Sequence, residues 1–109
     1  VVTENGCAVR EPSARDARDD AARVRYLRDY IAQLYYAIKD GADVRGYYVW
    51  SFMDNFEWAF GFTKQFGIVH VDFGTQARTP KASARLLSQL AQTNALSLPA
   101  ESRHERKRT

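Results

Sequence analysis

Two carboxylates set among aromatic rings carry the strongest chemical signal in this 109-residue chain. Glu4 lies in the run VVTENG at residues 1–6, and Glu57 lies in the run WSFMDNFEW at residues 50–58. A carboxylate can act as a nucleophile, or it can accept charge-assisted hydrogen bonds from hydroxyl groups. The flat rings of Trp50 and Trp58 can pack against the apolar face of a pyranose. Together these residue types predict half of a site that grips and attacks a sugar.

Both carboxylates are expected to follow β-strands. Residues 1–3 are apolar or β-branched and the turn signal Asn5-Gly6 follows, so Glu4 is expected at a strand's C-terminal tip. Residues 44–52 form a nearly continuous apolar run, which is typical of a parallel strand buried on both faces. The segment that carries Glu57 begins at the end of this second strand.

Two helices are predicted beside these strands. From about residue 19 apolar residues recur mostly every three or four positions, which predicts an amphipathic helix that ends at Gly41. Its apolar residues are Ala22, Val24, Leu27, Ile31, Leu34, Tyr35 and Ile38. A second helix is predicted with Thr79 as its N-cap and Pro80 as its first residue. Its apolar stripe consists of Ala84, Leu86, Leu87, Leu90 and Ala91.

The order of these elements predicts an α/β fold. Strand, helix, strand, long loop and helix follow one another, and this alternation favours a parallel sheet. Residues 10–18 are expected to form a loop, and residues 66–73 a short hairpin or an extended loop. A sheet of two strands is marginal by itself and leaves apolar edges unpaired. We therefore expect the chain, which opens on Val1 instead of methionine, to be a piece of a longer protein.

Three motifs in order make the chain resemble glycoside hydrolase family 1, the β-glucosidases and their relatives. They are Val2-Thr3-Glu4-Asn5-Gly6, the run at residues 50–58 and the pair Phe66-Gly67, and the run RTPKASA at residues 78–84 extends the likeness. The resemblance implies the C-terminal part of a (β/α)8 TIM barrel, namely its last two β/α units and its eighth loop. Glu4 would lie on the seventh strand and Trp50 on the eighth. Residues 1–98 would belong to the catalytic barrel, and residues 99–109 would form a disordered basic tail.

The activity that the resemblance implies is retaining hydrolysis of β-glycosides. Glu4 would be the nucleophile, which attacks the anomeric carbon and forms a covalent intermediate. The family's acid/base glutamate lies in a Thr-x-Asn-Glu-Pro motif, and no such motif occurs in these 109 residues. The two carboxyl groups of a retaining enzyme stand about 5 to 5.5 Å apart. The second group is therefore expected from the missing N-terminal part of the barrel, and the isolated chain is expected to be inactive.

The resemblance also assigns the residues that hold the sugar. Glu57 would accept hydrogen bonds from two hydroxyls, Trp50 would form the platform under the ring, Trp58 would donate its indole N–H to a hydroxyl, and Phe66 would close the apolar side. Because a carboxylate at Glu57 would repel a phosphate, the expected partner is an unphosphorylated β-glycoside. Glucose is expected first, with galactose or fucose tolerated. No cofactor and no metal is expected.

The sequence departs from the family's usual pattern at two positions. Gln65 stands where an arginine commonly precedes the Phe-Gly pair, and Phe62 stands where tyrosine is frequent. Neither change removes a catalytic group. Loss of the arginine is expected to weaken a structural ion pair under the eighth loop.

Each of these residues also has a structural explanation when it is taken singly. Glu4 is then an exposed turn carboxylate, Trp50 a strand core residue, Trp58 a cover for a helix end and Glu57 a solvated charge. The joint pattern favours the sugar site. Two alternatives for the whole chain stay open. It is either a non-catalytic remnant that binds sugar weakly or complements a polypeptide with the first six strands, or a piece without a stable fold.

Composition and charge exclude other classes of function. The net charge is +3, and residues 99–109 hold two of the surplus charges, which is too weak and local for a nucleic-acid surface. The single Cys7 allows no intramolecular disulfide, and His70 and His104 lie at no metal-ligand spacing. A reduced, cytoplasmic setting is therefore favoured. No apolar run reaches the roughly 18 residues of a membrane helix, so no membrane partner is expected.

Overall fold

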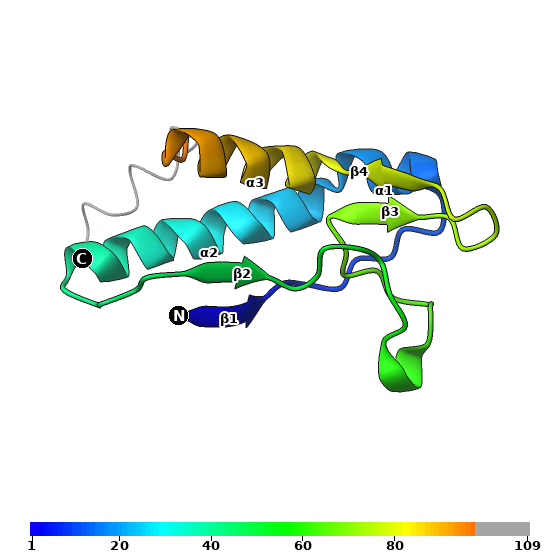
Figure 1. The fold of residues 1–109 in the computed structure, drawn as a ribbon, viewed down its shortest axis with the longest axis horizontal. Helices are drawn as coiled ribbons and strands as arrows, with labels where there is room; N and C mark the ends of the chain where they lie inside the picture. The colour runs from blue at the N-terminus through cyan, green and yellow to red at the C-terminus, as the bar shows by residue number, and fades with distance from the viewer. Residues whose placement is uncertain (98–109) are drawn as a thin grey trace.

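Two pairs of strands and a layer of helices make up residues 1–97, which is the part of the chain that the computed structural model describes (Figure 1). The predicted basic tail at residues 99–109 lies outside the described residues. In chain order the elements are β1 (Val2–Asn5), α1 (Ala14–Asp19), α2 (Ala21–Lys39), β2 (Tyr47–Val49), the 3₁₀ helix η1 (Trp58–Phe60), β3 (Val69–Val71), β4 (Arg78–Pro80) and α3 (Ala82–Thr93).

The strands β1 and β2 pair in parallel, as the alternation of elements predicts. Val2 lies opposite Tyr47, and Asn5 lies opposite Val49. The second strand is shorter than the apolar run at residues 44–52 predicted. Three of its residues are in strand conformation, and β1 is the one strand beside it in the described part of the chain, although Gly46, Trp50 and Ser51 on its flanks also make backbone hydrogen bonds. The two strands place residues 4 and 50 at the same end of the sheet.

The helices α2 and α3 lie together on one side of the strands (Figure 1). Leu27 and Ile31 of α2 pack with Leu86 of α3 and with Ile68 and Val69 at the start of β3. The 3.6-residue period of the apolar positions explains this contact, because it puts them on one face of each helix. α2 ends before Gly41, whose φ of +104° is a left-handed conformation that favours glycine. Both predicted helices are therefore confirmed, although Ala22, Tyr35 and Ile38 of α2 and Ala91 of α3 are exposed.

The prediction of a loop at residues 10–18 is wrong for its second half, where the short helix α1 forms. Ser13 acts as its N-cap, since its hydroxyl accepts a hydrogen bond from the Asp16 amide at 3.2 Å. Ala17 of this helix is fully buried. A serine followed three residues later by an acidic residue is an N-terminal helix signal, and that signal identifies α1 more reliably than the surrounding polarity does.

The prediction that Thr79 caps the last helix is also wrong. Thr79 and Pro80 belong to β4, which pairs with β3 in an antiparallel hairpin, with His70 opposite Thr79. The hairpin expected near residues 66–73 therefore forms with a partner outside that segment. α3 begins at Ala82, and Lys81 is its N-cap residue. The extended conformation is favoured here because the strand satisfies backbone groups that a free helix end would leave unpaired.

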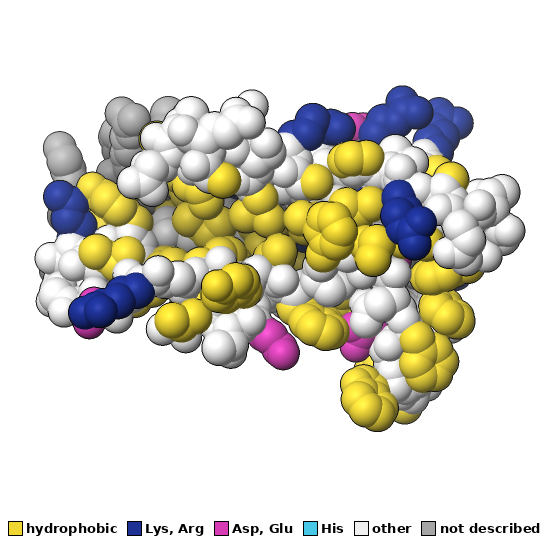
Figure 2. Space-filling view, in the orientation of Figure 1, with side chains coloured by type: hydrophobic (Ala, Val, Ile, Leu, Met, Phe, Trp, Pro, Cys, Tyr) yellow, Lys and Arg dark blue, Asp and Glu magenta, His cyan; other side chains and the backbone are white. Residues whose placement is uncertain are grey.

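The side of the strands away from the helices carries the loop between β2 and β3 (Figure 1). Figure 2 shows hydrophobic side chains both between the helices and the strands and over this loop. Exposed aromatic residues of the loop are Trp50, Phe52, Phe56, Trp58, Phe60 and Phe62. Within residues 1–97, none of the helices combines the length and apolar character needed to cross a bilayer.

Candidate active site

The ends of β1 and β2 bring two of the predicted site segments side by side. The Trp50 amide donates a hydrogen bond of 2.9 Å to the Asn5 carbonyl, directly after Glu4. A Cβ atom added at Gly6 would lie 1.8 Å from the Trp50 carbonyl oxygen. Glycine is thus required at this position because the two backbones approach too closely for any side chain. The Asn5-Gly6 pair therefore has a second role besides the turn, because it allows the ends of β1 and β2 to approach closely.

Asn5 is anchored by two tyrosines on the helix side of the sheet. Tyr47 of β2 donates its hydroxyl to Asn5 Oδ1 at 2.7 Å, and Asn5 Nδ2 donates to the hydroxyl of Tyr26 on α2 at 3.2 Å. Burial raises the pKa of Tyr47 to about 12, with a further contribution from the neighbouring Tyr26 and Cys7. Tyr47 therefore stays protonated and remains a donor. The carboxylate of Glu4, one residue earlier, is exposed.

The second predicted carboxylate, Glu57, is held by two donors on one oxygen. Trp50 Nε1 donates to Glu57 Oε1 at 2.9 Å, and Asn55 Nδ2 donates to the same atom at 3.0 Å. Two bonds to a single carboxylate oxygen fix the rotation of the group. Neither of these donors occupies Oε2. The arrangement leaves that oxygen able to accept hydrogen bonds from a ligand.

Asn55 is supported in turn by Ser51, a residue that the sequence prediction did not select. The buried Ser51 hydroxyl lies 3.2 Å from Asn55 Oδ1 and 2.8 Å from the Met53 carbonyl oxygen. The peptide bond between Trp50 and Ser51 is cis. The run at residues 50–58 therefore contains its own set of supporting hydrogen bonds, and Asn55 joins the list of candidate site residues.

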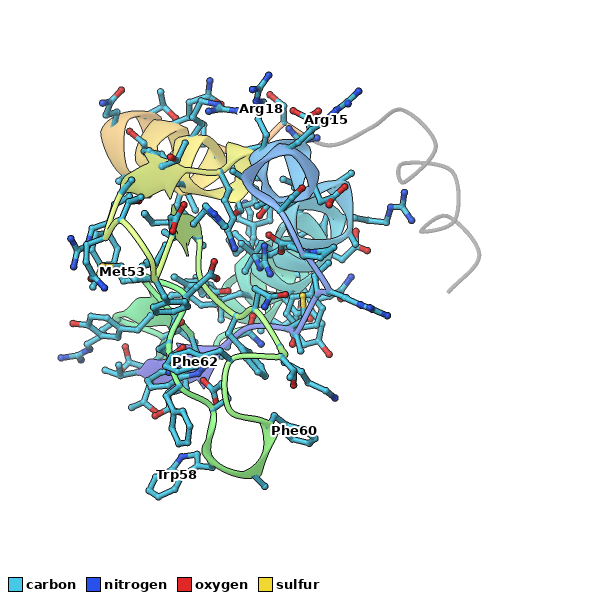
Figure 3. All side chains as sticks on the ribbon, turned by 90° about the vertical axis from the view of Figure 1, so that its right-hand side faces the viewer. Arg15, Arg18, Met53, Trp58, Phe60 and Phe62 are labelled. Carbon is cyan, nitrogen blue, oxygen red and sulfur yellow. The ribbon has the colours of Figure 1, made fainter. Side chains whose placement is uncertain are left out.

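The remaining predicted residues lie farther along the loop. Trp58 opens η1 and is 86% exposed, and Figure 3 shows it at the tip of the loop, on the other side of the ribbon from Phe60 and pointing away from the helices. Phe66 is half-buried, and its carbonyl accepts a hydrogen bond from the Ser51 amide at 3.1 Å. The structure thus brings Trp50 and Glu57 into direct contact and places Phe66 against the same segment. Trp58 makes no such contact with Glu57 among the described interactions.

A group of buried ionic residues lies beneath this loop, and the sequence prediction did not identify it. We call Glu11, Asp20, Arg23, Asp54 and Lys81 the buried ion cluster; each is at most 5% exposed. Lys81 Nζ lies 2.8 Å from Asp54 Oδ1 and 2.9 Å from Glu11 Oε2. Arg23 pairs with both Glu11 and Asp20. Burial opposes the charge of Arg23, but its hydrogen bonds to the two carboxylates outweigh burial and raise its pKa.

Gln65 belongs to the same region, and its position bears on the expected loss of an ion pair. Its Oε1 accepts the Glu11 amide at 2.7 Å, its Nε2 donates to the Phe62 carbonyl at 3.0 Å, and its own carbonyl accepts from Arg23. An amide side chain can make one accepting and one donating bond of this kind, whereas an arginine can only donate. Gln65 therefore ties the loop to the Glu11 segment through hydrogen bonds.

Comparison with known proteins identifies the family. The sequence model of glycosyl hydrolase family 1 matches residues 1–96. The chain belongs to glycosyl hydrolase family 1. The resemblance seen in the motifs is therefore confirmed, and so is the expectation of a glycoside hydrolase by family.

Several members of family 1 are similar to the chain over most of its length. Beta-glucosidase 4 of Oryza sativa subsp. japonica is 52% identical over 92 residues, which are 81% of this chain and 19% of the relative. Beta-glucosidase A of Acetivibrio thermocellus is 42% identical over 86% of this chain and 21% of its own length. A 6-phospho-beta-galactosidase of Streptococcus equi subsp. zooepidemicus is 42% identical over 89% of this chain. The chain thus spans about a fifth of the length of the relatives that it matches.

Solved structures of family 1 agree with the fold. The family 1 β-glucosidase of Thermotoga maritima in complex with isofagomine lactam aligns with a TM-score of 0.81 and 45% identity. The alignment covers 87% of this chain and 22% of that one. Such relatives are TIM barrels, and this chain aligns with a small part of the barrel.

Proposed function

We propose that this chain supplies the nucleophile and part of the sugar-binding site of a retaining β-glycosidase. The observation that carries the proposal is the fixed carboxylate of Glu57, which Trp50 and Asn55 hold through one oxygen at the end of the strand beside Glu4. A fixed acceptor and an indole ring next to a second, exposed carboxylate form an arrangement suited to hold a pyranose over a nucleophile. β1 and β2 would then be the seventh and eighth strands of the barrel.

Glu4 is the nucleophile in this proposal. One of its carboxylate oxygens forms a bond to the anomeric carbon while the bond from that carbon to the leaving oxygen breaks, and an acid donates a proton to the leaving group. Water then attacks the same carbon, gives a proton to the conjugate base and releases Glu4. The exposed position of Glu4 at the tip of β1 leaves it accessible for this attack.

The acid/base group must come from residues outside this sequence. The Thr-x-Asn-Glu-Pro motif that carries it in the family does not occur among the 109 residues. We therefore expect no turnover from the 109 residues by themselves, and we expect activity when a polypeptide with the rest of a barrel is supplied.

The substrate in this proposal is an unphosphorylated β-glycoside, with β-glucosides first. β-Glucosidases are among the similar proteins, and so is a 6-phospho-beta-galactosidase. The charge of Glu57 favours the former, since a carboxylate fixed at the sugar would repel a phosphate on that sugar. Both charges would lie in a partly desolvated site, where repulsion is stronger than in water.

A non-catalytic role is the second candidate, and the missing acid/base motif favours it. In that case the chain would bind a sugar weakly through Trp50 and Glu57, or it would complete another polypeptide without turnover. The two candidates differ in whether Glu4 becomes covalently linked to a sugar.

A chimaera tests the two candidates. Residues 1–96 replace the matching segment of the Thermotoga maritima β-glucosidase, which is 45% identical to this chain. We expect hydrolysis of p-nitrophenyl β-glucoside, and we expect a 2-deoxy-2-fluoroglucoside to label the peptide that contains Glu4. Glu4→Gln should lower kcat by roughly 10³-fold or more. A folded chimaera that binds a glucosidase inhibitor but neither turns over nor becomes labelled would favour the non-catalytic role.

A further inference from the structure

Lys81 is a cation that both segments of the candidate site share through their carboxylates. Its ammonium group is fully buried. It contacts Glu11, in the segment that follows β1, and Asp54, in the loop that leads to Glu57. Lys81 is itself the N-cap residue of α3, so its backbone is fixed by a helix and by a hydrogen bond from its amide to the Ile68 carbonyl at 2.9 Å.

Asp54 transmits this anchor to the loop. Its Oδ1 accepts from Lys81 Nζ at 2.8 Å and also from the Gly67 amide at 3.0 Å. Its own amide donates to the Val69 carbonyl at 3.1 Å. A Cβ atom added at Gly67 would lie 2.2 Å from the Asp54 amide nitrogen, so the outgoing and the returning segments of the loop are in backbone contact here. Asp54 therefore closes the base of the loop, and Asn55, the donor to Glu57, is the next residue.

The Glu11 side of the anchor is equally fixed. Arg23 of α2 pairs with Glu11 and with Asp20, and Asp20 accepts hydrogen bonds from the amide and the hydroxyl of Ser83 on α3. Both helices therefore hold Glu11. A buried charge that loses its partner is strongly unfavourable, so structures in which one of these ion pairs is broken are high in free energy.

We propose that Lys81 is a positioning residue that sets the Glu57 loop relative to the segment of Glu4. The helix layer holds Lys81, Lys81 holds Asp54 and Glu11, and the loop above Asp54 then presents Glu57 with its bonds to Trp50 and Asn55. The assignment of Glu57 as a sugar-binding carboxylate rests on the proposed function. The mechanical connection from Lys81 to the Trp50–Glu57 hydrogen bond does not rest on it.

The two tryptophan indoles provide a test that needs no turnover. The sequence contains two tryptophans, so a ¹⁵N-labelled sample of the full 109-residue chain gives two indole N–H signals. Trp50 donates to Glu57, whereas Trp58 is 86% exposed. In the wild type we expect slow hydrogen exchange at the Trp50 indole and fast exchange at the Trp58 indole. Lys81→Met should speed exchange at Trp50 by roughly tenfold or more and leave Trp58 unchanged.

A second pair of variants separates positioning from a general loss of stability. Leu27→Ala creates a cavity in the core between the helices. It should lower the melting temperature about as much as Lys81→Met does. It should leave the Trp50 indole signal in place at temperatures where the chain is folded. Lys81→Arg keeps a cation between Glu11 and Asp54 and should restore part of the protection at Trp50.

Two results would overturn the proposal. One is a wild-type spectrum in which the two indoles exchange equally fast, and the other is a Lys81→Met spectrum with the Trp50 signal unchanged. In the chimaera, Lys81→Met should raise KM for the glucoside more than Leu27→Ala does. If the chimaera is active and Lys81→Met and Leu27→Ala have equal KM values, the positioning role is contradicted while the proposed function stands. If the chimaera is inactive but the indoles show the expected exchange pattern, the proposed function is contradicted while the positioning role stands.

Discussion

Trp50 and Glu57 are joined by a hydrogen bond of 2.9 Å between the indole nitrogen of a strand-end residue and the carboxylate of a loop residue. Asn55 donates to the same oxygen at 3.0 Å. Three residues that a sugar site would need to keep in register therefore hold one another before any ligand is present. Such preorganisation reduces the conformational entropy that binding must overcome.

Removal of the Asn55 donor should weaken sugar binding. Hydrogen bonds to charged groups contribute about 1.5–3 kcal/mol, so Asn55→Ala in the chimaera should lower kcat/KM for a glucoside by roughly ten- to a hundredfold. The measurement is steady-state hydrolysis of p-nitrophenyl β-glucoside. Thr63→Ala is the matched control, since it removes a hydrogen bond to the Phe60 carbonyl in the same loop. If both variants lost the same activity, Asn55 would have no specific role.

The charge of Glu57 should exclude phosphorylated sugars. Glu57→Gln removes the charge and keeps the size of the side chain, so the ratio of kcat/KM for a 6-phosphoglucoside to that for a glucoside should rise. Competition between the two substrates in the chimaera measures this ratio. Asp43→Asn removes an exposed charge that pairs with Arg45 and should leave the ratio unchanged. A wild-type chimaera that prefers the phosphorylated sugar would contradict the substrate proposal.

The stability of the chain should fall in strongly alkaline solution because of Tyr47. Burial raises its pKa to about 12, whereas the unfolded chain has the ordinary value of about 10. Between these values the native state keeps a proton that the unfolded state loses, so the free energy of unfolding decreases as the pH rises. The stabilisation is complete below pH 10 and is lost as the pH approaches 12.

Urea unfolding at several pH values between 9 and 12 measures this dependence. Tyr47→Phe has no phenol to ionise, so its stability should depend less steeply on pH in this window. It should also be less stable than the wild type at pH 8, because Asn5 loses the hydrogen bond from the Tyr47 hydroxyl. Equal slopes for the two proteins would show that Tyr47 is not the group responsible.

The close approach of the strands should make Gly6 intolerant of any side chain. Gly6→Ala would place a Cβ atom 1.8 Å from the Trp50 carbonyl oxygen, and only a backbone shift can relieve that contact. We expect a loss of about 3 kcal/mol or more in the free energy of unfolding. At Gly46 the nearest atom would be the Val1 Cγ1 at 3.4 Å, so Gly46→Ala should have a small effect. Thermal unfolding of both variants compares them.

The sequence was sufficient to predict the parts that depend on local pattern or on the family's motifs. The parallel pair of strands and the two longer helices agree with the prediction. Periodicity and turn residues are local signals, and they act where neighbours along the chain decide the structure. The roles assigned to Glu4, Trp50, Glu57, Trp58 and Phe66 stay predictions until activity is measured.

The buried ion cluster shows why the rest escaped prediction. Lys81 and Asp54 are 27 positions apart, and Ser83 bonds to Asp20 across 63 positions. Each charge by itself has the pattern of a solvated residue. At the buried ion cluster no local signal was present, whereas at Thr79-Pro80 a local helix signal was present but was overridden by the pairing of β4 with β3. In both cases distant parts of the chain decide the outcome.

The shared pairing within the buried ion cluster limits how this sequence can change over time. Each of its cations serves two carboxylates, so replacing Arg23 leaves Asp20 without its cation in the cluster, and replacing Lys81 does the same to Asp54. A tolerated change must therefore alter several members at once or restore a partner elsewhere, which makes these positions energetically non-additive. Functional descendants of this chain should vary freely on the helix surface long before they vary beneath the Glu57 loop.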